Sequence, residues 1–383
     1  MGSARMSNTP SGILFNSSDD TASINLPYVP ARRVAYVDSS RGILILLMLA
    51  VHAASPCVDS IRGSIQGFWV FDIATKGFVM LAGFTFGIVY TEAYPPKFGK
   101  ALRRCFELLV VMFCSNMLLT IARLALTDEL GNAITWSWFL GLFTFQTEYN
   151  ISGVLLPIAL LLPLLFVVYD MERRWGMVTT LCVVILMLTA CFTWAFAGPH
   201  NKMFAGVIDV GFAKGVGGFP LVPYMSYGIL GFLTARIFGS ANIQIAWPAL
   251  ATTIFIGLLL YAATIPHIVP LRLSSTDSLV IVSKYMKAEG MFLMILGVGM
   301  AVSLLFPYAS QQNPINLLGY YGLFAFVIHR LIGHSTILIF HLHDGGYLVF
   351  IFQFTIILVL TYLACLLRTQ VMSVDRFLSK LFL

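Results

Sequence analysis

Asp38, Arg41 and His52 are ionisable residues spaced so that a single helix would carry all three on one face. They belong to the first long apolar run of the chain, which is uninterrupted from Ile43 to Val51. At 100° per residue, the step from Arg41 to His52 is about three turns, and Asp38 precedes Arg41 by about one turn. The rise from Arg41 to His52 is about 16 Å, which would place Arg41 near a membrane surface and His52 deep in the span.

A histidine at that depth is a candidate functional residue, because an ionisable group is costly to bury in lipid. An imidazole exchanges protons near neutral pH, so His52 could serve as a general base. The alternative is a structural histidine that is bonded to a neighbouring helix. The alignment of Asp38, Arg41 and His52 favours the functional interpretation.

A second pair of ionisable residues, His329 and Arg330, lies within an apolar run near the end of the chain. Adjacent residues on a helix point about 100° apart, so at most one of them would face a given cavity directly. Two such groups inside a span need polar surroundings, which could be a structural network or a substrate site. We assign both to the expected substrate-binding set.

Basic residues gather where the third apolar run begins, at Lys100, Arg103 and Arg104. Such a cluster is explained by the excess of basic residues on the cytoplasmic side of membrane proteins, or by an anion site for the phosphates of coenzyme A. Lys76 lies within the second run, four residues after Asp72, and could pair with it or line the cavity that holds His52. We assign Lys76, Lys100, Arg103 and Arg104 to the expected donor-binding set.

The composition excludes a soluble globular protein, a nucleic-acid-binding domain and a disordered chain. Hydrophobic residues make up 58% of the 383 residues and charged residues 10%, against about 25% charged in soluble domains. The net charge of +6 therefore reports membrane topology rather than a nucleic-acid partner. No CxxC, CxxH, G-x-S-x-G or Walker-type pattern is present, so we expect no metal.

The predicted fold is all-α, a polytopic membrane bundle of about ten transmembrane helices. A crossing needs about 20 apolar residues, and the chain offers ten such runs. These are about 37–55, 68–90, 102–125, 150–169, 176–197, 220–238, 247–265, 288–308, 317–338 and 347–367. A shorter aromatic piece, 136–145, is expected to lie at the interface or to be re-entrant.

The distribution of Lys and Arg predicts that both termini are cytoplasmic. With the N-terminus inside, fourteen basic residues fall on the inner side and six on the outer side, in agreement with the positive-inside rule. Residues 1–31 are polar and predicted to be a disordered cytoplasmic tail, and residues 32–383 to form the transmembrane domain.

Four stretches resemble the acyltransferase-3 superfamily of membrane acyltransferases. The Asp38-x-x-Arg41-Gly42 pattern with His52 resembles its opening signature, and residues 78–84 (FVMLAGF) resemble its second-span stretch. Arg103 and Arg104 match its basic third-span start, and residues 318–329 resemble its late LGxxSxxxYxxH pattern. Residues 68–115 are similar to the periplasmic-glucan succinyltransferase type, and residues 219–231 to the heparan-α-glucosaminide N-acetyltransferase-like type.

This resemblance implies an enzyme of about ten helices that takes an acyl group from a cytoplasmic acyl-CoA. It would deliver an acetyl- or succinyl-class group to a hydroxyl of an exported or cell-surface glycan, across a bacterial inner membrane. His52 matches the catalytic histidine of the family, as base or as acyl-carrying nucleophile, with Arg41 and Asp38 beside it. Further partners would be the lipid bilayer, glycan-synthesis machinery or a second copy of the chain, and no nucleic acid.

A transporter or flippase for a glycan or lipid-linked sugar is the alternative function, since it too would need many helices and buried charges. The one-sided arrangement of Asp38, Arg41, His52 and the basic cluster favours a bound anionic thioester. Paired helices broken by Gly or Pro in two halves of the chain would have favoured transport. Nothing speaks positively for a sensor or scaffold.

Overall fold

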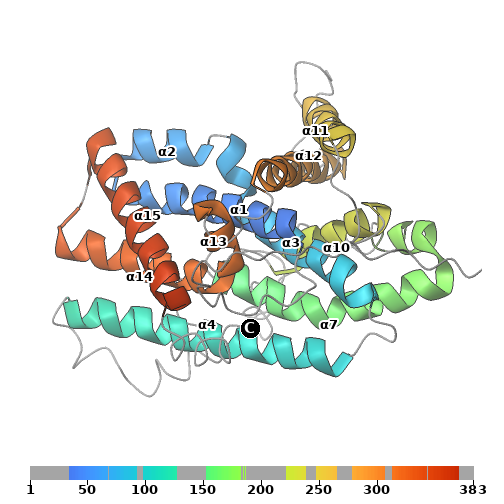
Figure 1. Cartoon of the computed structure of the whole chain (residues 1–383), viewed down its shortest axis with the longest axis horizontal. Coiled ribbons are helices and arrows are strands. Elements are labelled where there is room, and N and C mark those ends of the chain that lie inside the picture. Colours follow the sequence, from blue (N-terminus) through green and yellow to red (C-terminus); the bar gives the residue numbers. More distant parts are fainter. Residues whose placement is uncertain are drawn as a thin grey trace, which may run out of the picture. The chain divides into compact units, whose positions relative to one another are not determined.

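The computed structural model describes residues 34–67, 69–92, 98–126, 152–182, 184, 186, 221–238, 247–264, 278–306, 313–342 and 344–370. These ranges are almost entirely helical, as predicted, and within them the extended backbone pairing is a single bridge between Cys57 and Gly345. The helices are α1 Ala35–Ala53, α2 Asp59–Gly67, α3 Trp69–Glu92, α4 Phe98–Leu126, α7 Ser152–Trp175, α10 Leu221–Phe238, α11 Trp247–Ala262, α12 Ser278–Leu305, α13 Pro314–Tyr320, α14 Gly322–Ile339 and α15 Tyr347–Gln370 (Figure 1).

Six of the described helices are long and apolar enough to cross a membrane, which indicates an integral membrane protein. They lie in α1, α4, α7, α12, α14 and α15, and the shorter apolar stretches Ile73–Ile88 and Pro248–Ala262 lie in α3 and α11. The predicted count of ten and the cytoplasmic termini remain predictions. The tail 1–31, the aromatic piece 136–145 and most of the run 176–197 lie outside the described residues.

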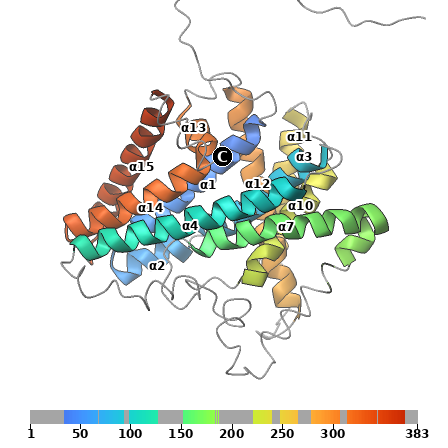
Figure 2. The ribbon, with the colours of Figure 1, turned by 90° about the horizontal axis from the view of Figure 1, so that it is seen from below.

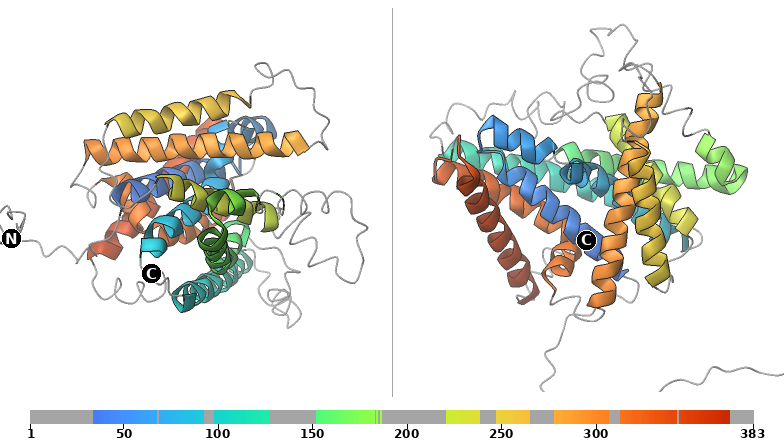
Figure 3. Two further views of the ribbon diagram at one scale, coloured as in Figure 1. Left: turned by 90° about the vertical axis from the view of Figure 1, so that its right-hand side faces the viewer. Right: turned by 90° about the horizontal axis from the view of Figure 1, so that it is seen from above.

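α1 lies at the centre of the described helices and packs against α3, α12, α13, α14 and α15. Leu44, Ile45 and Leu49 are fully buried and supply its apolar contacts. Figure 2 shows α4 running beside α14 at one end and α7 at the other, and both views of Figure 3 show α11 alongside α12. The first predicted span is therefore an internal helix that can present its side chains to several neighbours.

Close backbone contact fixes α13 against the start of α1. A Cβ added at Gly42 would collide with the backbone oxygen of Ile315, and one added at Gly319 would collide with that of Asp38. Buried Ser39 reinforces this contact by donating a hydrogen bond to Asn316 Oδ1 at 2.5 Å. The polar turn before the apolar run is thus buried against α13, and this position sets the register between the two helices.

The ninth predicted span is two helices rather than one. α13 begins with Pro314 at its first turn, capped by Asn313, and the chain leaves helical geometry at Tyr321 (φ −95°, ψ 31°) before α14 starts at Gly322. A Cβ at Gly322 would collide with the Arg41 side chain, so this break lets the chain pass close to Arg41. The apolar pattern continues through the break, which is why the sequence predicted a single helix.

Candidate functional site

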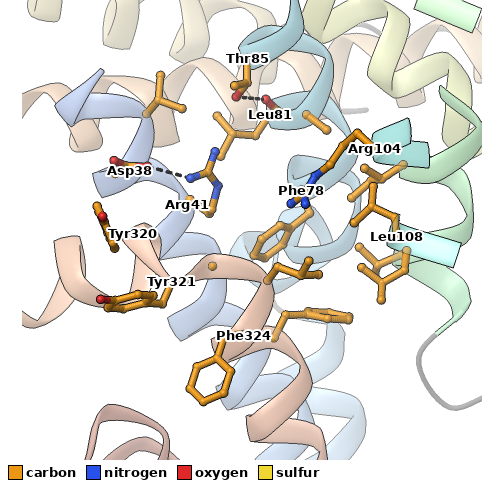
Figure 4. Close-up of a pocket in the computed structure, with 18 of the residues that line it drawn as sticks. Asp38, Arg41, Phe78, Leu81, Thr85, Arg104, Leu108, Tyr320, Tyr321 and Phe324 are labelled. Carbon is orange, nitrogen blue, oxygen red and sulfur yellow. Dashed lines mark hydrogen bonds and ion pairs between the residues drawn. The ribbon is translucent and has the colours of Figure 1, made fainter. Parts of the chain in front are cut away.

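A cavity of about 460 Å³ opens between α1, α3, α4, α7, the α13–α14 junction and α15 (Figure 4). Its charged lining residues are Asp38, Arg41, Arg104 and Arg368, so three guanidinium groups face one carboxylate. In Figure 4, Arg41 from α1 and Arg104 from α4 extend into the cavity from opposite sides. We call this cavity the basic pocket, and its excess of positive charge suits an anionic ligand.

Arg41 is held firmly at one wall of the basic pocket. Its Nη1 donates to Asp38 Oδ1 at 2.7 Å and to the Gly319 carbonyl at 3.2 Å. The side chains of Arg41 and Asp38 are 25% and 15% exposed, so the pair lies at the edge of the pocket rather than in free solvent. The sequence predicted that these two residues share one helix stripe but not that they pair, and in the structure Asp38 orients the guanidinium.

Arg104 and Arg368 reach the basic pocket from helices that are distant in the sequence. Arg104 donates to Glu107 Oε2 at 3.2 Å, and its side chain is 23% exposed. Arg368 is buried, with its guanidinium carbon 4.5 Å from the centre of the Tyr321 ring and 5.2 Å from that of Phe324. Stacking on aromatic faces stabilises a guanidinium in an apolar setting while leaving its edge able to bind anions.

His52, His329 and Arg330 form a second group, which we call the histidine cluster. The rings of His52 and His329 are stacked with centroids 5.3 Å apart, and Arg330 Nη1 lies 2.9 Å from His52 Nδ1 and 3.3 Å from its Nε2. His52 is in the last turn of α1, but its partners lie in the middle of α14. This contact joins the end of α1 to the centre of α14, and the depth of His52 in a membrane stays a prediction.

The hydrogen bonds of the histidine cluster define the proton position of His329 and leave that of His52 open. A guanidinium only donates, and Arg330 Nη1 lies within 3.3 Å of both ring nitrogens of His52, so this contact does not fix which of them carries the hydrogen. His329 Nδ1 lies 3.0 Å from the Ala325 carbonyl and donates to it, which leaves a lone pair on Nε2. That Nε2 atom is buried and has no hydrogen-bond partner. In the described part of the chain, the polar contacts of His52 are with Arg330 and not with a carboxylate.

Phe326 contacts both the basic pocket and the histidine cluster. Phe78 and Phe326 both line the pocket, and their ring centroids are 6.1 Å apart. Phe326 also packs edge-to-face against His329, with ring centroids 5.5 Å apart. The pocket and the cluster are therefore neighbours along α1 and α14, with Phe326 in contact with both.

The remaining predicted donor residues lie outside the pocket as its described lining defines it. Arg103 is 81% exposed and donates to Glu107 Oε1 at 2.9 Å, and Lys100 is exposed on the same helix. The Lys76 ammonium lies 5.9 Å from the centre of the Tyr227 ring of α10, and the side chain of Asp72 is outside the described part. Of the predicted donor-binding set, Arg104 is thus the member that joins Arg41.

Sequence reasoning treated Arg368 only as a cytoplasmic charge, and it missed the roles of Tyr321 and Phe326. No local pattern links Arg368 with residues almost fifty positions earlier, so the sequence carried no signal for this contact. Tyr321 supplies the ring on which the Arg368 guanidinium lies.

The fold and the site define a helical integral membrane protein with a basic pocket beside a histidine cluster. No family model matches this chain, and searches of the curated proteins and of the solved structures give no match. Among the described residues, no group of three or more His, Cys, Asp or Glu side chains is arranged to hold a metal ion.

Proposed function

We propose that this protein is a membrane acyltransferase that moves an acyl group from acyl-CoA to a hydroxyl of a glycan. The observation that carries the proposal is the placement of the basic pocket and the histidine cluster along the same helix. Arg41 and His52 are about 16 Å apart along α1, and α14 passes both groups. A donor with phosphates at one end and a reactive thioester at the other end of a long arm matches this arrangement.

The basic pocket suits the nucleotide end of such a donor. After Asp38 and Glu107 offset one charge each, one net positive charge remains among Arg41, Arg104 and Arg368 to face phosphate oxygens. Charge-assisted hydrogen bonds from guanidinium groups to phosphate are among the strongest polar contacts in proteins. The rings of Tyr320, Tyr321 and Phe324 offer aromatic faces on which the nucleobase of the donor can stack.

The histidine cluster suits the thioester end. Acyl transfer needs a group that accepts the hydroxyl proton and donors that stabilise the oxyanion. The cluster offers imidazole lone pairs and the guanidinium of Arg330 in a largely buried place. Electrostatic stabilisation is stronger where water is excluded. In this proposal the basic pocket opens to the cytoplasm, where acyl-CoA is made, and the glycan is reached from the other side of the membrane.

Binding of acetyl-CoA and of acetyl-pantetheine to the purified protein in detergent tests this proposal. The two ligands share the thioester and differ in the phosphates and the nucleoside. We expect measurable affinity for acetyl-CoA or succinyl-CoA, at least tenfold weaker binding of the pantetheine analogue, and acyl transfer to a β-glucan oligosaccharide. Equal affinity for both ligands would remove the basic pocket from donor binding. Glycan movement across vesicles without any acylation would instead support the transporter.

A further inference from the structure

We propose that His329 is the general base of the transfer and that His52 and Arg330 together bind the oxyanion. This assignment rests on the proposed acyltransferase function. It gives the two histidines different roles according to the contacts of their ring nitrogens, which the sequence did not address. It also gives His52 a different role from the one that the family resemblance implies.

The hydrogen bonds of His329 fit a base. Its Nδ1–H is fixed by the Ala325 carbonyl at 3.0 Å, so the lone pair must be on Nε2. A backbone acceptor on one ring nitrogen holds both the tautomer and the orientation of the other, as a base requires. The Nε2 atom is buried without a partner, and a buried polar atom left unsatisfied is unfavourable. A ligand hydroxyl that donated to Nε2 would remove that cost.

The contacts of His52 do not fit a general base. Arg330 Nη1 lies 2.9 Å from its Nδ1 and 3.3 Å from its Nε2, so a guanidinium that can only donate already faces both of its ring nitrogens. His52 and Arg330 are both partly exposed, whereas His329 is fully buried. We assign the oxyanion to the N–H groups of Arg330 and His52, because such donors form the usual oxyanion site in acyl transfer.

The charges favour this division of roles. The Arg330 guanidinium places a positive charge beside the imidazole of His52, which stacks on that of His329. An oxyanion that forms beside Arg330 and His52 supplies the missing negative charge at the moment when His329 gains its proton. The ring stacking of His52 on His329, at 5.3 Å, keeps the two charges close together.

The step is balanced as follows. The acceptor oxygen forms a C–O bond to the thioester carbon, its proton moves to His329 Nε2, and the carbonyl electron pair moves to the oxygen held by His52 and Arg330. On collapse the C–S bond breaks, and His329 returns the proton to the thiolate sulfur. The products are the ester and the free thiol, and both imidazoles are neutral again. Phe326, which covers His329 on the pocket side, must move to admit the thioester.

The variant His329→Asn removes the basic ring nitrogen but can keep the structural hydrogen bond to the backbone. The Asn amide can still donate to the Ala325 carbonyl but offers no basic nitrogen. The probes are acetyl-CoA and succinyl-CoA, with either a β-glucan oligosaccharide or hydroxylamine as acceptor. Neutral hydroxylamine attacks as a free amine and depends less on a base. His341→Asn, at an exposed left-handed position that Asn tolerates (φ 49°), is the matched control.

We expect His329→Asn to lower transfer to the glycan by about 10²–10⁴-fold while keeping donor affinity, thermal melting and most of the reaction with hydroxylamine. His341→Asn should change none of these. Transfer to the glycan within threefold of the wild type, or equal loss with both acceptors, would overturn the assignment of the base. If the wild-type protein binds neither acyl-CoA, the proposed function itself fails. The binding measurement alone distinguishes this outcome from a wrong assignment of the base.

Discussion

The basic pocket and the histidine cluster both include residues of α1 and α14, yet their charged groups have different kinds of partner. In the pocket, Arg41 is paired with Asp38, Arg104 is paired with Glu107, and Arg368 lies on aromatic rings. In the cluster, Arg330 donates to a neutral imidazole, and one histidine nitrogen is buried without a partner. A group whose charges are already satisfied is suited to steady binding, whereas a group with unmet hydrogen-bonding capacity is suited to a transient partner.

After His329→Asn, the largest expected effect comes from His52→Ala. Loss of one oxyanion donor lowers turnover by about 10²–10³-fold in known acyl-transfer sites. Donor affinity should remain, because the basic pocket is about 16 Å away along α1. Turnover at saturating acetyl-CoA and the dissociation constant should be measured in the same preparation. Substantial transfer together with a lowered melting temperature would make His52 a structural residue.

Arg41→Ala should affect both affinity and stability. It removes a guanidinium from the pocket and leaves the Asp38 carboxylate, 15% exposed, without its partner at 2.7 Å. We expect the donor dissociation constant to rise more than tenfold and the free energy of unfolding to fall by about 1–3 kcal/mol. Asp38→Asn/Arg41→Ala, which removes both charges, should recover part of the stability but none of the affinity. Recovery of affinity in the double variant would separate Arg41 from donor binding.

Arg104→Ala and Arg103→Ala form a matched pair that tests the pocket itself. Both residues bind Glu107 from the same helix, but only Arg104 of these two lines the pocket. A charge-assisted hydrogen bond contributes about 1.5–3 kcal/mol, so Arg104→Ala should raise the donor dissociation constant about tenfold or more. Arg103→Ala should leave it unchanged. Similar losses in the two variants would mean that net charge near the membrane, rather than the pocket, attracts the donor.

The smallest effect is expected from Arg368→Lys. The ammonium keeps the charge but cannot stack flat on the rings of Tyr321 and Phe324, where the guanidinium now lies at 4.5 and 5.2 Å. Such contacts are worth roughly 0.5–2 kcal/mol, so a loss of donor affinity of about three- to tenfold should appear in titration calorimetry. A variant with unchanged affinity would show that Arg368 only anchors α15.

The helical class and the face shared by Asp38 and Arg41 could be predicted from the sequence because they depend on local periodicity. An apolar run predicts a helix that is buried in lipid or protein. Spacing at 3.6 residues per turn predicts which residues share one face of that helix. The same signals made His52 a candidate functional residue. They could not show that His329 and Arg330 are its neighbours, since 278 positions separate His52 from Arg330.

Contacts between distant segments account for the parts that the sequence did not predict. The break at Tyr321 depends on the close approach of α13 to Gly42 and of Gly322 to Arg41, which no local pattern encodes. The exposure of Arg103 and the inward position of Arg104 differ because one helix turns adjacent residues by about 100°, and the sequence did not show which of them faces the interior.

A structure of the protein bound to a ketone analogue of acetyl-CoA, which cannot transfer its acyl group, tests the central claim most directly. The account predicts phosphates among Arg41, Arg104 and Arg368, the analogue's carbonyl oxygen within hydrogen-bonding distance of His52 and Arg330, and the Phe326 ring displaced from its position against His329. Phosphates bound outside the basic pocket, or an acyl group that remains on the pocket side of an unmoved Phe78–Phe326 pair, would contradict it.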